Sequence, residues 1–598
     1  MQLIILATIL DRLVHCHGSL VKESIAAVKN KSQKVFMNKL FPRRKFIKNA
    51  LAAGLGSGVV LSSWWTKVLA ALSDLEISRV FEHGIASGDP THDGVVLWTR
   101  INASGRTTVG WQVAADDEFV NVVQQGESIT DDFSDYTVKI EVKNLRPGEV
   151  YYYRFSAEGT RSGPGRTRTL PVGPIKRLGI AVVSCSNYPF GYFNTYEEIA
   201  SDEDIEFVVH LGDYIYEYGA DGWGAEQGVR LARTHSPRHE IVSLADYRQR
   251  HGQYKTDRAS RLMHASHPLI VTWDDHESAN NPWVGGAQNH QPEEEGNWQV
   301  RREAALRAFY EWMPIRQPLV DGKHEELWRH FSFGDLASMT TIETRHTGRS
   351  LQVSYSDHLT DINSLSQRDQ FLDAVLGNPN RTMLSGSMED FLAAKLKSSV
   401  DSGKAWRILG NQIPMARTHV PDIATRLTRD AFSSLDSLPN SYRNLSRLGE
   451  LDLPLYLDTW DGYPVAREKL YDLCRECGAC DLIVLTGDSH AFWANELFNT
   501  GNQSMGVELG TTGVTSPGDF EIYGPQGAVA IDKLVANHNR EVIWTDCTRR
   551  GFVKLILTQD SVQADYIAVN TVDSEKYFPS LVRQMRITKK DGGLVFDD

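Results

Sequence analysis

Cysteine and basic charge are both scarce in this chain. Six cysteines are spread over 598 residues, which is not the disulfide framework of a small secreted scaffold. Lys and Arg total 63 against 76 Asp and Glu, for a net charge of −13, whereas proteins that bind nucleic acid usually present a basic face. We therefore expect no nucleic-acid-binding surface. The acidic surplus fits an ordinary solvated surface or, in part, a site that holds cations.

Long uninterrupted hydrophobic runs and internal repeats are also missing. The apolar N-terminal stretch at residues 50–70 is broken by glycines, serines and Lys67, so we expect no stable membrane span in the mature protein. Hydrophobic residues make up 41% of the chain and charged residues 23%, as in ordinary globular proteins. The length leaves room for more than one domain and for a large core.

Paired arginines precede that stretch in "PRRKFIKNALAAGLGSGVV". The pair beginning at Arg43, followed by a weakly hydrophobic segment, resembles a twin-arginine export signal. We interpret residues 37–70 as the signal peptide, with cleavage close after Ala70, because Met37 is the more normal start for such a signal. Residues 1–36 are then a wrongly assigned N-terminal extension. The competing interpretations are a chance basic pair before an amphipathic helix and an N-terminal membrane anchor.

An export signal of this kind carries expectations about partners and location. The twin-arginine export machinery would be a partner, and the mature protein would be periplasmic or extracellular. Because this route carries proteins that have already folded, it suits a protein that acquires a metal or another bound group before export.

Three of the six cysteines crowd into "CRECGAC", at positions 474, 477 and 480. This spacing can hold zinc, but a fourth ligand is not evident in the sequence. A disulfide, or simply buried thiols on a helix, fits the segment at least as well. The sequence leaves these alternatives open.

Residues 76–172 have the pattern of short β-strands joined by turns. "GVVLWTRI", "TVGWQVAAD", "YTVKIEVKNL" and "EVYYYRFSAEG" are rich in β-branched and aromatic residues, which favour strands. We predict a small all-β sandwich, similar to a fibronectin type III-like module. Its expected role is that of a structural cap beside a catalytic domain.

From residue 176 to about 590, short apolar runs are separated by segments with helical character. Buried strands that alternate with helices predict a layered α/β domain. The predicted strands are residues 178–184, 206–212, 268–273, 337–343, 406–411 and 481–487. "FVKLILTQ" and "VQADYIAV" predict a closing antiparallel pair, and the polar stretch 418–452 predicts a loop-rich insertion.

Polar residues able to bind metal directly follow five of these runs. Ligands in open α/β sheets sit at the carboxyl ends of strands, so we expect these residues to converge. A lone Asp after a strand is usually a turn or helix cap, but that explanation is weak for five strand ends together. The residues are Cys185, Asp213, the "DDHE" run at 274–277 with Asn280 and Asn281, Asn411 with Gln412, and Asp488 with His490.

The ligand types point to two kinds of cation. Carboxylates and amide oxygens favour hard cations such as calcium, magnesium or manganese, whereas imidazole, thiolate and phenolate favour transition metals. Asp213 stands between the two sets and could bridge two ions through its two oxygens. Tyr216, three residues later, would lie on the same side of a turn. A phenol with a pKa near 10 is a poor ligand, unless a highly charged ion such as ferric iron removes its proton.

The segments "SCSNY", "GDYIY", "WDDHE" and "GDSHAFW" resemble the calcineurin-like metallophosphoesterase superfamily. More closely, they resemble the PhoD-type alkaline phosphatase/phosphodiesterase family. The resemblance covers nearly the whole mature chain, because "FEHGIASGDPTHDGVVLWTR", "VTWDDHESANN", "ILGNQIPMA" and "IVLTGDSHAFWANEL" follow in the family's order. Any one motif would be weak evidence, but four ordered motifs at strand ends are specific.

The resemblance implies a four-layer sandwich of two β-sheets flanked by helices. It also implies a site with one ferric ion and calcium, with zinc or manganese as the alternative metals. Carried onto this sequence, the iron ligands would be Cys185, Asp213, Tyr216 and His490. The calcium ligands would be Asp213, Asp275 and Asp488, with Asn281 or Asn280 as a further ligand.

One residue departs from the family pattern. In "TIETRHTGR", Glu343 stands where the family usually has Asp. The change keeps the charge and lengthens the side chain. This acid would either contact metal or orient Arg345, and a role as a helix cap or supporting acid is an equal alternative.

The implied function is that of a secreted metal-dependent alkaline phosphatase, which hydrolyses phosphate monoesters and could also accept diesters. Cations would lower the pKa of a bound water from about 16 to about 7, and the hydroxide would attack phosphorus without a protein nucleophile. His276 would protonate the leaving group or bind a phosphoryl oxygen, although cations nearby should lower its pKa. Arg345 and Arg349 are candidates for clamping the phosphate, with a structural salt bridge as the alternative for each.

Two other functions are compatible with the sequence. One is a phosphodiesterase or phospholipase D-type activity, because monoesters, diesters and phospholipids are cleaved at the same chemical centre. The other is a non-catalytic binding protein with a metal-stabilised fold. The nearly complete ligand set, with His276 beside Asp275, argues against the second.

Overall fold

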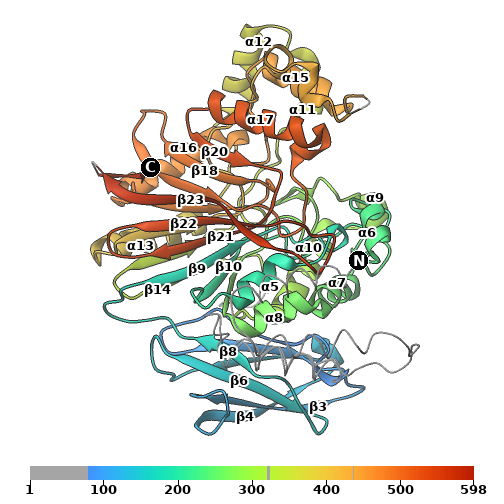
Figure 1. Cartoon of the computed structure of the whole chain (residues 1–598), viewed down its shortest axis with the longest axis vertical. Coiled ribbons are helices and arrows are strands. Elements are labelled where there is room, and N and C mark those ends of the chain that lie inside the picture. Colours follow the sequence, from blue (N-terminus) through green and yellow to red (C-terminus); the bar gives the residue numbers. More distant parts are fainter. Residues whose placement is uncertain (1–78, 319–322, 436, 591, 598) are drawn as a thin grey trace, which may run out of the picture. The chain divides into compact units, whose positions relative to one another are not determined.

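The computed structural model describes residues 79–598, except 319–322, 436, 591 and 598 (Figure 1). The elements below belong to the compact unit Trp64–Asp598. The predicted extension, the signal peptide and its cleavage point lie outside the described residues.

The largest sheet has ten strands in the order β24-β23-β22-β21-β9-β10-β11-β1-β2-β5. Its parallel centre consists of β9 (Leu178–Val183), β10 (Phe207–His210) and β11 (Leu269–Val271). The antiparallel strands on one side are β21 (Arg550–Leu557), β22 (Val562–Val569), β23 (Pro579–Lys590) and β24 (Gly593–Asp597). The pairing of β21 with β22 confirms the predicted closing pair.

The other side of this sheet is formed by strands from the N-terminal β-rich region. They are β1 (Ile85–Gly88), β2 (Val95–Arg100) and β5 (Thr137–Val142). Strand β1 runs parallel to β11, with Gly88 opposite Leu269. The predicted all-β character of this region is confirmed. One of its two layers, however, is continuous with the largest sheet, a pairing between distant segments that local sequence patterns do not reveal.

The second layer of the N-terminal region is a five-stranded sheet, in the order β4-β3-β6-β7 with β8 paired to β6. Its strands are β3 (Thr107–Ala114), β4 (Val122–Thr130), β6 (Val150–Ala157), β7 (Thr160–Arg161) and β8 (Gly165–Arg168). Buried side chains from both layers, among them Leu97, Val113 and Phe155, form the core between them.

A seven-stranded sheet packs face to face on the largest one, in the order β14-β15-β16-β17-β19-β18-β20. Its strands are β14 (Arg329–Phe333), β15 (Ala337–Thr341), β16 (Trp406–Gly410), β17 (Leu482–Thr486), β18 (Phe492–Phe498), β19 (Ser504–Gly510) and β20 (Val542–Asp546). Val182, Phe207, Ile408 and Leu485 belong to the core that joins the two sheets. Apart from these sheets, β12 (Pro282–Trp283) pairs with β13 (Gly286–Ala287).

Helices cover the outer faces of both sheets. Tyr196, Tyr247, Leu262 and Phe309 pack with the strands of the largest sheet, and Leu392 and Leu470 pack with those of the seven-stranded sheet. The helices on the first face are α5 (Asn194–Ser201), α7 (Leu244–Thr256), α8 (Arg258–Ser266) and α10 (Trp298–Trp312), and those on the second are α13 (Gly386–Asp401) and α16 (Pro464–Glu476). The predicted four-layer α/β sandwich is therefore confirmed.

The prediction of a loop-rich insertion at residues 418–452 is wrong in part. This segment contains α14 (Ile423–Arg426) and α15 (Ser441–Glu450). Leu445 and Leu448 of α15 are buried in a core shared with neighbouring helices, so tertiary packing stabilises a helix with few apolar positions. The gathered helices are labelled in Figure 1 as α11 (Tyr355–His358), α12 (Leu365–Gln370), α15 and α17 (Gly524–His538).

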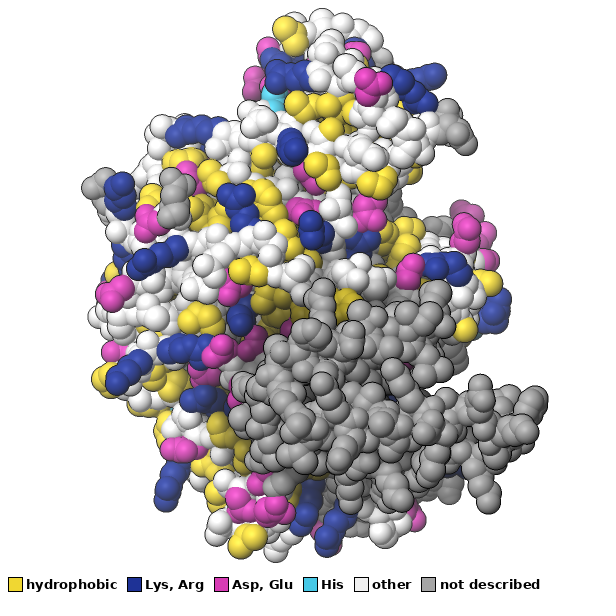
Figure 2. Space-filling model, in the orientation of Figure 1, with side chains coloured by type: hydrophobic (Ala, Val, Ile, Leu, Met, Phe, Trp, Pro, Cys, Tyr) yellow, Lys and Arg dark blue, Asp and Glu magenta, His cyan; other side chains and the backbone are white. Residues whose placement is uncertain are grey.

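Two short helices complete the fold, α6 (Ala225–Leu231) and α9 (Pro292–Glu295). None of the helices within the described residues has the length and apolar character needed to cross a bilayer. On the face shown in Figure 2, the described Lys and Arg side chains are interspersed with Asp and Glu.

Candidate active site

The predicted site residues meet at the carboxyl ends of strands from both large sheets. Cys185 follows β9, Asp213 follows β10, Asp275 follows β11 and Asp488 follows β17. A side chain at Gly487 would place its Cβ 2.4 Å from Ser184 Oγ, so glycine there lets the ends of β9 and β17 approach. The convergence expected from strand topology is present.

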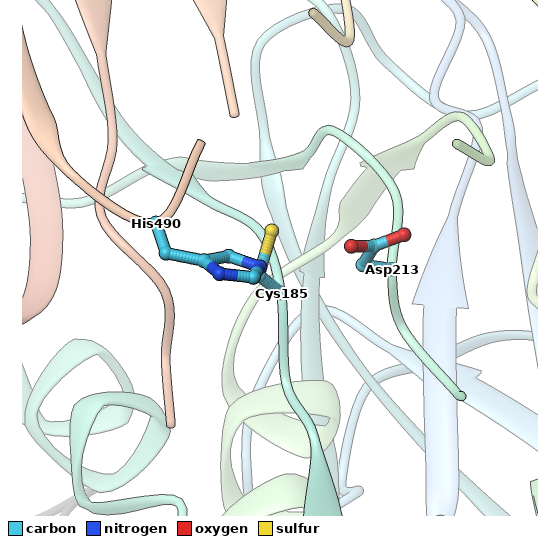
Figure 3. Close-up of side chains that lie close together, drawn as sticks. All are labelled: Cys185, Asp213 and His490. Carbon is cyan, nitrogen blue, oxygen red and sulfur yellow. The ribbon is translucent and has the colours of Figure 1, made fainter. Parts of the chain in front are cut away.

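Three groups of potential metal ligands overlap at this place. Within each group, one ligand atom per residue lies within 4.8 Å of the others. The groups are Cys185–Asp213–His490, Asp213–Asp275–His276 and Asp274–Asp275–Asp488. Figure 3 shows the first group, whose side chains come together from separate segments of the chain. Asp213 and Asp275 each belong to two groups, as expected of carboxylates that can bridge.

The backbone at these strand ends is unusual. Cys185, Asp213, Asp488 and His490 have φ values of 61°, 56°, 63° and 53°, in the left-handed region that non-glycine residues rarely adopt. Gly212, with φ 107°, allows a second close approach, because a Cβ there would lie 2.2 Å from the backbone nitrogen of Asp274. Four candidate ligands thus have a strained backbone conformation, which is common at functional sites.

Tyr216 lies beside the first group. Its hydroxyl donates a hydrogen bond to Asp213 Oδ2 at 2.9 Å and lies 3.4 Å from His490 Nε2. Burial, followed by the negative charge of Asp213, raises the pKa of Tyr216 well above its ordinary value. Without a cation, therefore, this phenol stays protonated. Burial lowers the pKa of His490 to about 3, which keeps its imidazole neutral, the form that binds metal.

Arg345 is surrounded by the carboxylates of the third group. Its Nε donates to Asp274 Oδ1 at 2.6 Å, and its terminal nitrogen lies 3.1 Å from Asp488 Oδ1 and 3.8 Å from Asp275 Oδ1. Burial raises the pKa of Asp274 to about 6, although Arg345 opposes the shift. Burial and the nearby acids also raise the pKa values of Asp213 and Asp488. One guanidinium does not compensate this concentration of negative charge.

His276 is held by Glu217, a residue that sequence reasoning did not single out. Its Nδ1 lies 2.7 Å from Glu217 Oε2, and its Nε2 lies 3.9 Å from Asp275 Oδ2. Burial alone would lower the pKa of His276, but Asp275 and Glu217 raise it well above the ordinary value. The protein's own carboxylates thus favour the protonated form that a general acid needs, opposite to the expected effect of cations.

Two further acids support the site through backbone hydrogen bonds. Glu277 accepts from the nitrogens of Asp213, Tyr214 and Asp274 at 2.6–3.0 Å. Glu343 accepts from the nitrogens at 345, 346 and 347 at 2.7–2.9 Å. Glu343 therefore caps the turn that carries Arg345, which combines the capping and orienting roles considered for it. Both acids lie inside recognisable motifs, but sequence alone does not distinguish an acid that binds metal from one that only hydrogen-bonds the backbone.

Arg349, Asn280 and Asn281 make their side-chain hydrogen bonds outside the three ligand groups. The guanidinium of Arg349 donates to the carbonyl of Asp458 and lies 5.0 Å from the centre of the Tyr463 ring. Asn281 donates to Asp275 Oδ2 through its backbone nitrogen at 2.9 Å, while its side-chain amide bonds Gln288. The side chain of Asn280 also bonds Gln288. These contacts position neighbours of the cluster.

The site and the fold agree with what is known of other proteins. A family model described as "PhoD-like phosphatase" matches residues 180–566, and one described as "PhoD-like phosphatase, N-terminal domain" matches residues 68–171. The chain belongs to the PhoD-like phosphatase family. Membership confirms the resemblance found in the sequence and makes the chain a phosphoric ester hydrolase, with phosphate esters as substrates.

Two relatives show how far this family likeness extends. "Alkaline phosphatase D" of Bacillus subtilis (strain 168) is 33% identical over 560 residues, covering 90% of this chain and 86% of the relative. A solved structure described as "Structure of PhoD" superposes with a TM-score of 0.70 at 30% identity, covering 87% of this chain and 93% of the other. The two family models together match the N-terminal β-rich region and most of the catalytic layers.

The donor set fits the metal dependence expected of a PhoD-like metallophosphatase. Thiolate, imidazole and phenol donors meet on one side, and carboxylates meet on the other. Asp274 Oδ2 and Asp275 Oδ1 are buried without a hydrogen-bond partner. Buried carboxylate oxygens are costly when unpaired, and cations would satisfy them.

The "CRECGAC" segment lies apart from this site. Cys474 is buried and Cys477 and Cys480 are partly buried, and in the described part of the chain all are free thiols. They also form no group of three close metal ligands among the described residues. Of the alternatives for this segment, this structure shows no disulfide within the described residues. The three cysteines are free thiols on α16 and directly after it.

Proposed function

We propose that this PhoD-like phosphatase is an exported, metal-dependent phosphomonoesterase. The observation that carries the proposal is the sharing of Asp213 and Asp275 among three ligand groups. Neighbouring groups that share a carboxylate suit neighbouring cations, the arrangement used in many enzymes that cleave phosphate esters. Export rests on the arginine pair at Arg43, and a periplasmic or extracellular location follows from it.

The donors divide between two kinds of metal. Cys185, Asp213, Tyr216 and His490 would hold a ferric ion, because thiolate, imidazole and phenolate suit a transition metal. Asp274, Asp275 and Asp488 would hold calcium, because carboxylate oxygens suit a hard cation. Zinc or manganese is the alternative metal. When bound, the cations would neutralise phosphoryl oxygens and lower the pKa of a water.

The chain's own residues supply the remaining needs of the reaction. Arg345 is fully buried among the carboxylates, and its Nη1, which has no hydrogen-bond partner, would be free to donate to a phosphoryl oxygen. His276, held protonated by Glu217 and Asp275, can donate a proton to the departing alkoxide from Nε2. Glu217 hydrogen-bonds Nδ1, so the proton on the other ring nitrogen, Nε2, is the one available for donation. Arg349, which donates to the carbonyl of Asp458, would support that loop.

Replacement of Asp213 tests the proposal most directly. Asp213→Asn removes the carboxylate shared by two ligand groups, so we expect activity to fall by roughly a thousandfold or more and bound metal to decrease. The protein is purified without chelator, its metals are measured by elemental analysis, and phosphate release is followed with an aryl monoester and the matching diester. Asp390→Asn, an exposed acid on α13, is the control and should match the wild type.

For each measurement, one result would contradict part of the proposal. Wild-type turnover in Asp213→Asn would remove this residue from the site. Faster cleavage of the diester than of the monoester would favour the phosphodiesterase alternative. Zinc or manganese in place of iron and calcium would contradict the assignment of metals while leaving the hydrolase intact.

A further inference from the structure

The candidate site opens to solvent on one side. The side chain of Asp488 is 16% exposed, and His490 and His276 are 9% and 6% exposed. The other ligand candidates are almost fully buried: Cys185, Asp213, Tyr216, Asp274 and Asp275. An ester whose phosphate reaches these residues therefore enters past Asp488 and His490, and its organic group stays on that side.

Trp223 stands beside this opening. It lies in the loop between β10 and α6, and it is 37% exposed. Its ring is nearly parallel to His490, with the centroids 5.6 Å apart and the planes inclined by 17°. Phe190 and Tyr216, with ring centroids 4.8 and 5.8 Å from the indole, support it. The indole is thus held in place by aromatic neighbours while more than a third of it remains accessible.

The leaving-group side of the site shares the same aromatic surroundings. His276, the proposed proton donor, stacks on Tyr216 with centroids 4.2 Å apart and lies 5.3 Å from Tyr218. Tyr218 in turn lies 6.2 Å from Trp223. These rings form a row that leads from the buried ligand groups to the exposed indole.

We infer that Trp223 is a specificity-determining residue that stacks on an aromatic ring in the organic group of the ester. The inference rests on the proposed function, which places the phosphate among the buried carboxylates. At the same opening Asp488 offers only a small polar carboxyl group, whereas an indole offers a broad apolar face to a planar ring. The substrate class is therefore phosphate esters with an aryl group or a nucleobase.

The experiment compares three esters in the metal-loaded enzyme. They are an aryl phosphate, a nucleoside monophosphate and glycerol phosphate, which has no ring. Trp223→Ala should lower kcat/KM for the two ring-bearing esters about tenfold, since stacking on an aromatic side chain is worth that much per ring, and leave glycerol phosphate unchanged. Trp223→Phe should restore most of the loss. Phe133→Ala, which removes an exposed ring held outside the site by Arg307, should change nothing.

The outcomes separate this inference from the proposed function. If the wild type cleaves none of the three esters, the proposed function fails. If the wild type is active and Trp223→Ala lowers kcat/KM equally for all three, Trp223 only supports His490, and the inference is wrong. Loss with the aryl ester alone would restrict the class to aryl groups, and loss with the nucleotide alone would restrict it to nucleobases. Metal content, measured on each variant, should stay at the wild-type level.

Discussion

Two clusters of buried titratable side chains lie in this molecule and are built in opposite ways. The acidic cluster contains Asp213, Asp274, Asp275 and Asp488 around Arg345. The second cluster surrounds Lys255, whose Nζ lies 3.0 Å from His264 Nε2 and faces the rings of Trp98 and Tyr214. In the described part of the chain, no carboxylate lies within ion-pair distance of Lys255. The other histidines of this cluster are His83, His210 and His251.

The two clusters respond to burial differently. Burial lowers the pKa of Lys255 far below its ordinary value and those of His83, His210 and His251 to about 3, so the second cluster is neutral and needs no counter-ion. The acidic cluster keeps Asp275 ionised, because His276 and Arg345 overcome the effect of burial on its pKa. A buried titratable group therefore does not mark a functional site; an uncompensated charge near an opening does.

The largest loss of activity is expected from a substitution that moves the backbone around the acidic cluster. Gly212→Ala would place a Cβ 2.2 Å from the nitrogen of Asp274 at a φ of 107°. We expect kcat/KM to fall roughly 100-fold and the free energy of unfolding to fall by about 3 kcal/mol. Gly173→Ala is the control, because Gly173 also has positive φ (75°) but no atom within 4 Å of the added Cβ. Equal effects of the two substitutions would assign the loss to φ alone.

A smaller change removes the charge that keeps His276 protonated. Glu217→Gln preserves shape but removes the carboxylate 2.7 Å from His276 Nδ1, so the pKa of His276 should fall. We expect kcat to fall about tenfold with KM nearly unchanged. Glu508→Gln serves as the control, since Glu508 is a buried acid bonded to Thr486 and Asn495 away from the ligand groups. It should lower the melting temperature without lowering kcat, and an equal fall in kcat would contradict the role of Glu217.

The smallest effect is expected from a substitution in the neutral cluster, and there we expect stability to increase. Below pH 10.5 the unfolded chain binds a proton at Lys255 that the folded protein does not, so stability is lost as the pH falls. Lys255→Met removes this loss and should raise the free energy of unfolding by about 1 kcal/mol at pH 7, with a smaller gain near pH 10. Melting temperatures at the two pH values measure it, and a lower value at pH 7 would show that Lys255 is charged or needed for packing.

The positions of the candidate ligands could be predicted because the ends of buried strands can be recognised in the sequence. Apolar runs ending in Cys185, Asp213 and Asp488 identify both the strands and the edge at which they meet. The family motifs add specificity to this local signal. Sequence could therefore predict the four layers, the place of the site and most of its side chains.

The remaining details depend on contacts that a local pattern does not contain. Asn281, with φ 50°, turns its backbone nitrogen toward Asp275 while its side chain bonds Gln288, and residue type alone does not reveal this arrangement. Arg349 looked equivalent to Arg345, yet only the latter lies among the carboxylates. Glu217 was hidden because its partner His276 lies far along the chain. These cases share one cause, since tertiary packing decides which atom of a side chain faces the site.

The pairing of β1 with β11 has a consequence for how the protein is made and handled. Strands from near residue 85 and from beyond residue 550 belong to one sheet, so a growing chain cannot complete that sheet until synthesis is almost finished. A shortened protein that starts at β9 would leave β11 with an unpaired edge, and unpaired edges promote aggregation. The N-terminal region is thus part of the scaffold of the hydrolase. Its removal would make the enzyme aggregate even though every candidate catalytic residue remained in the chain.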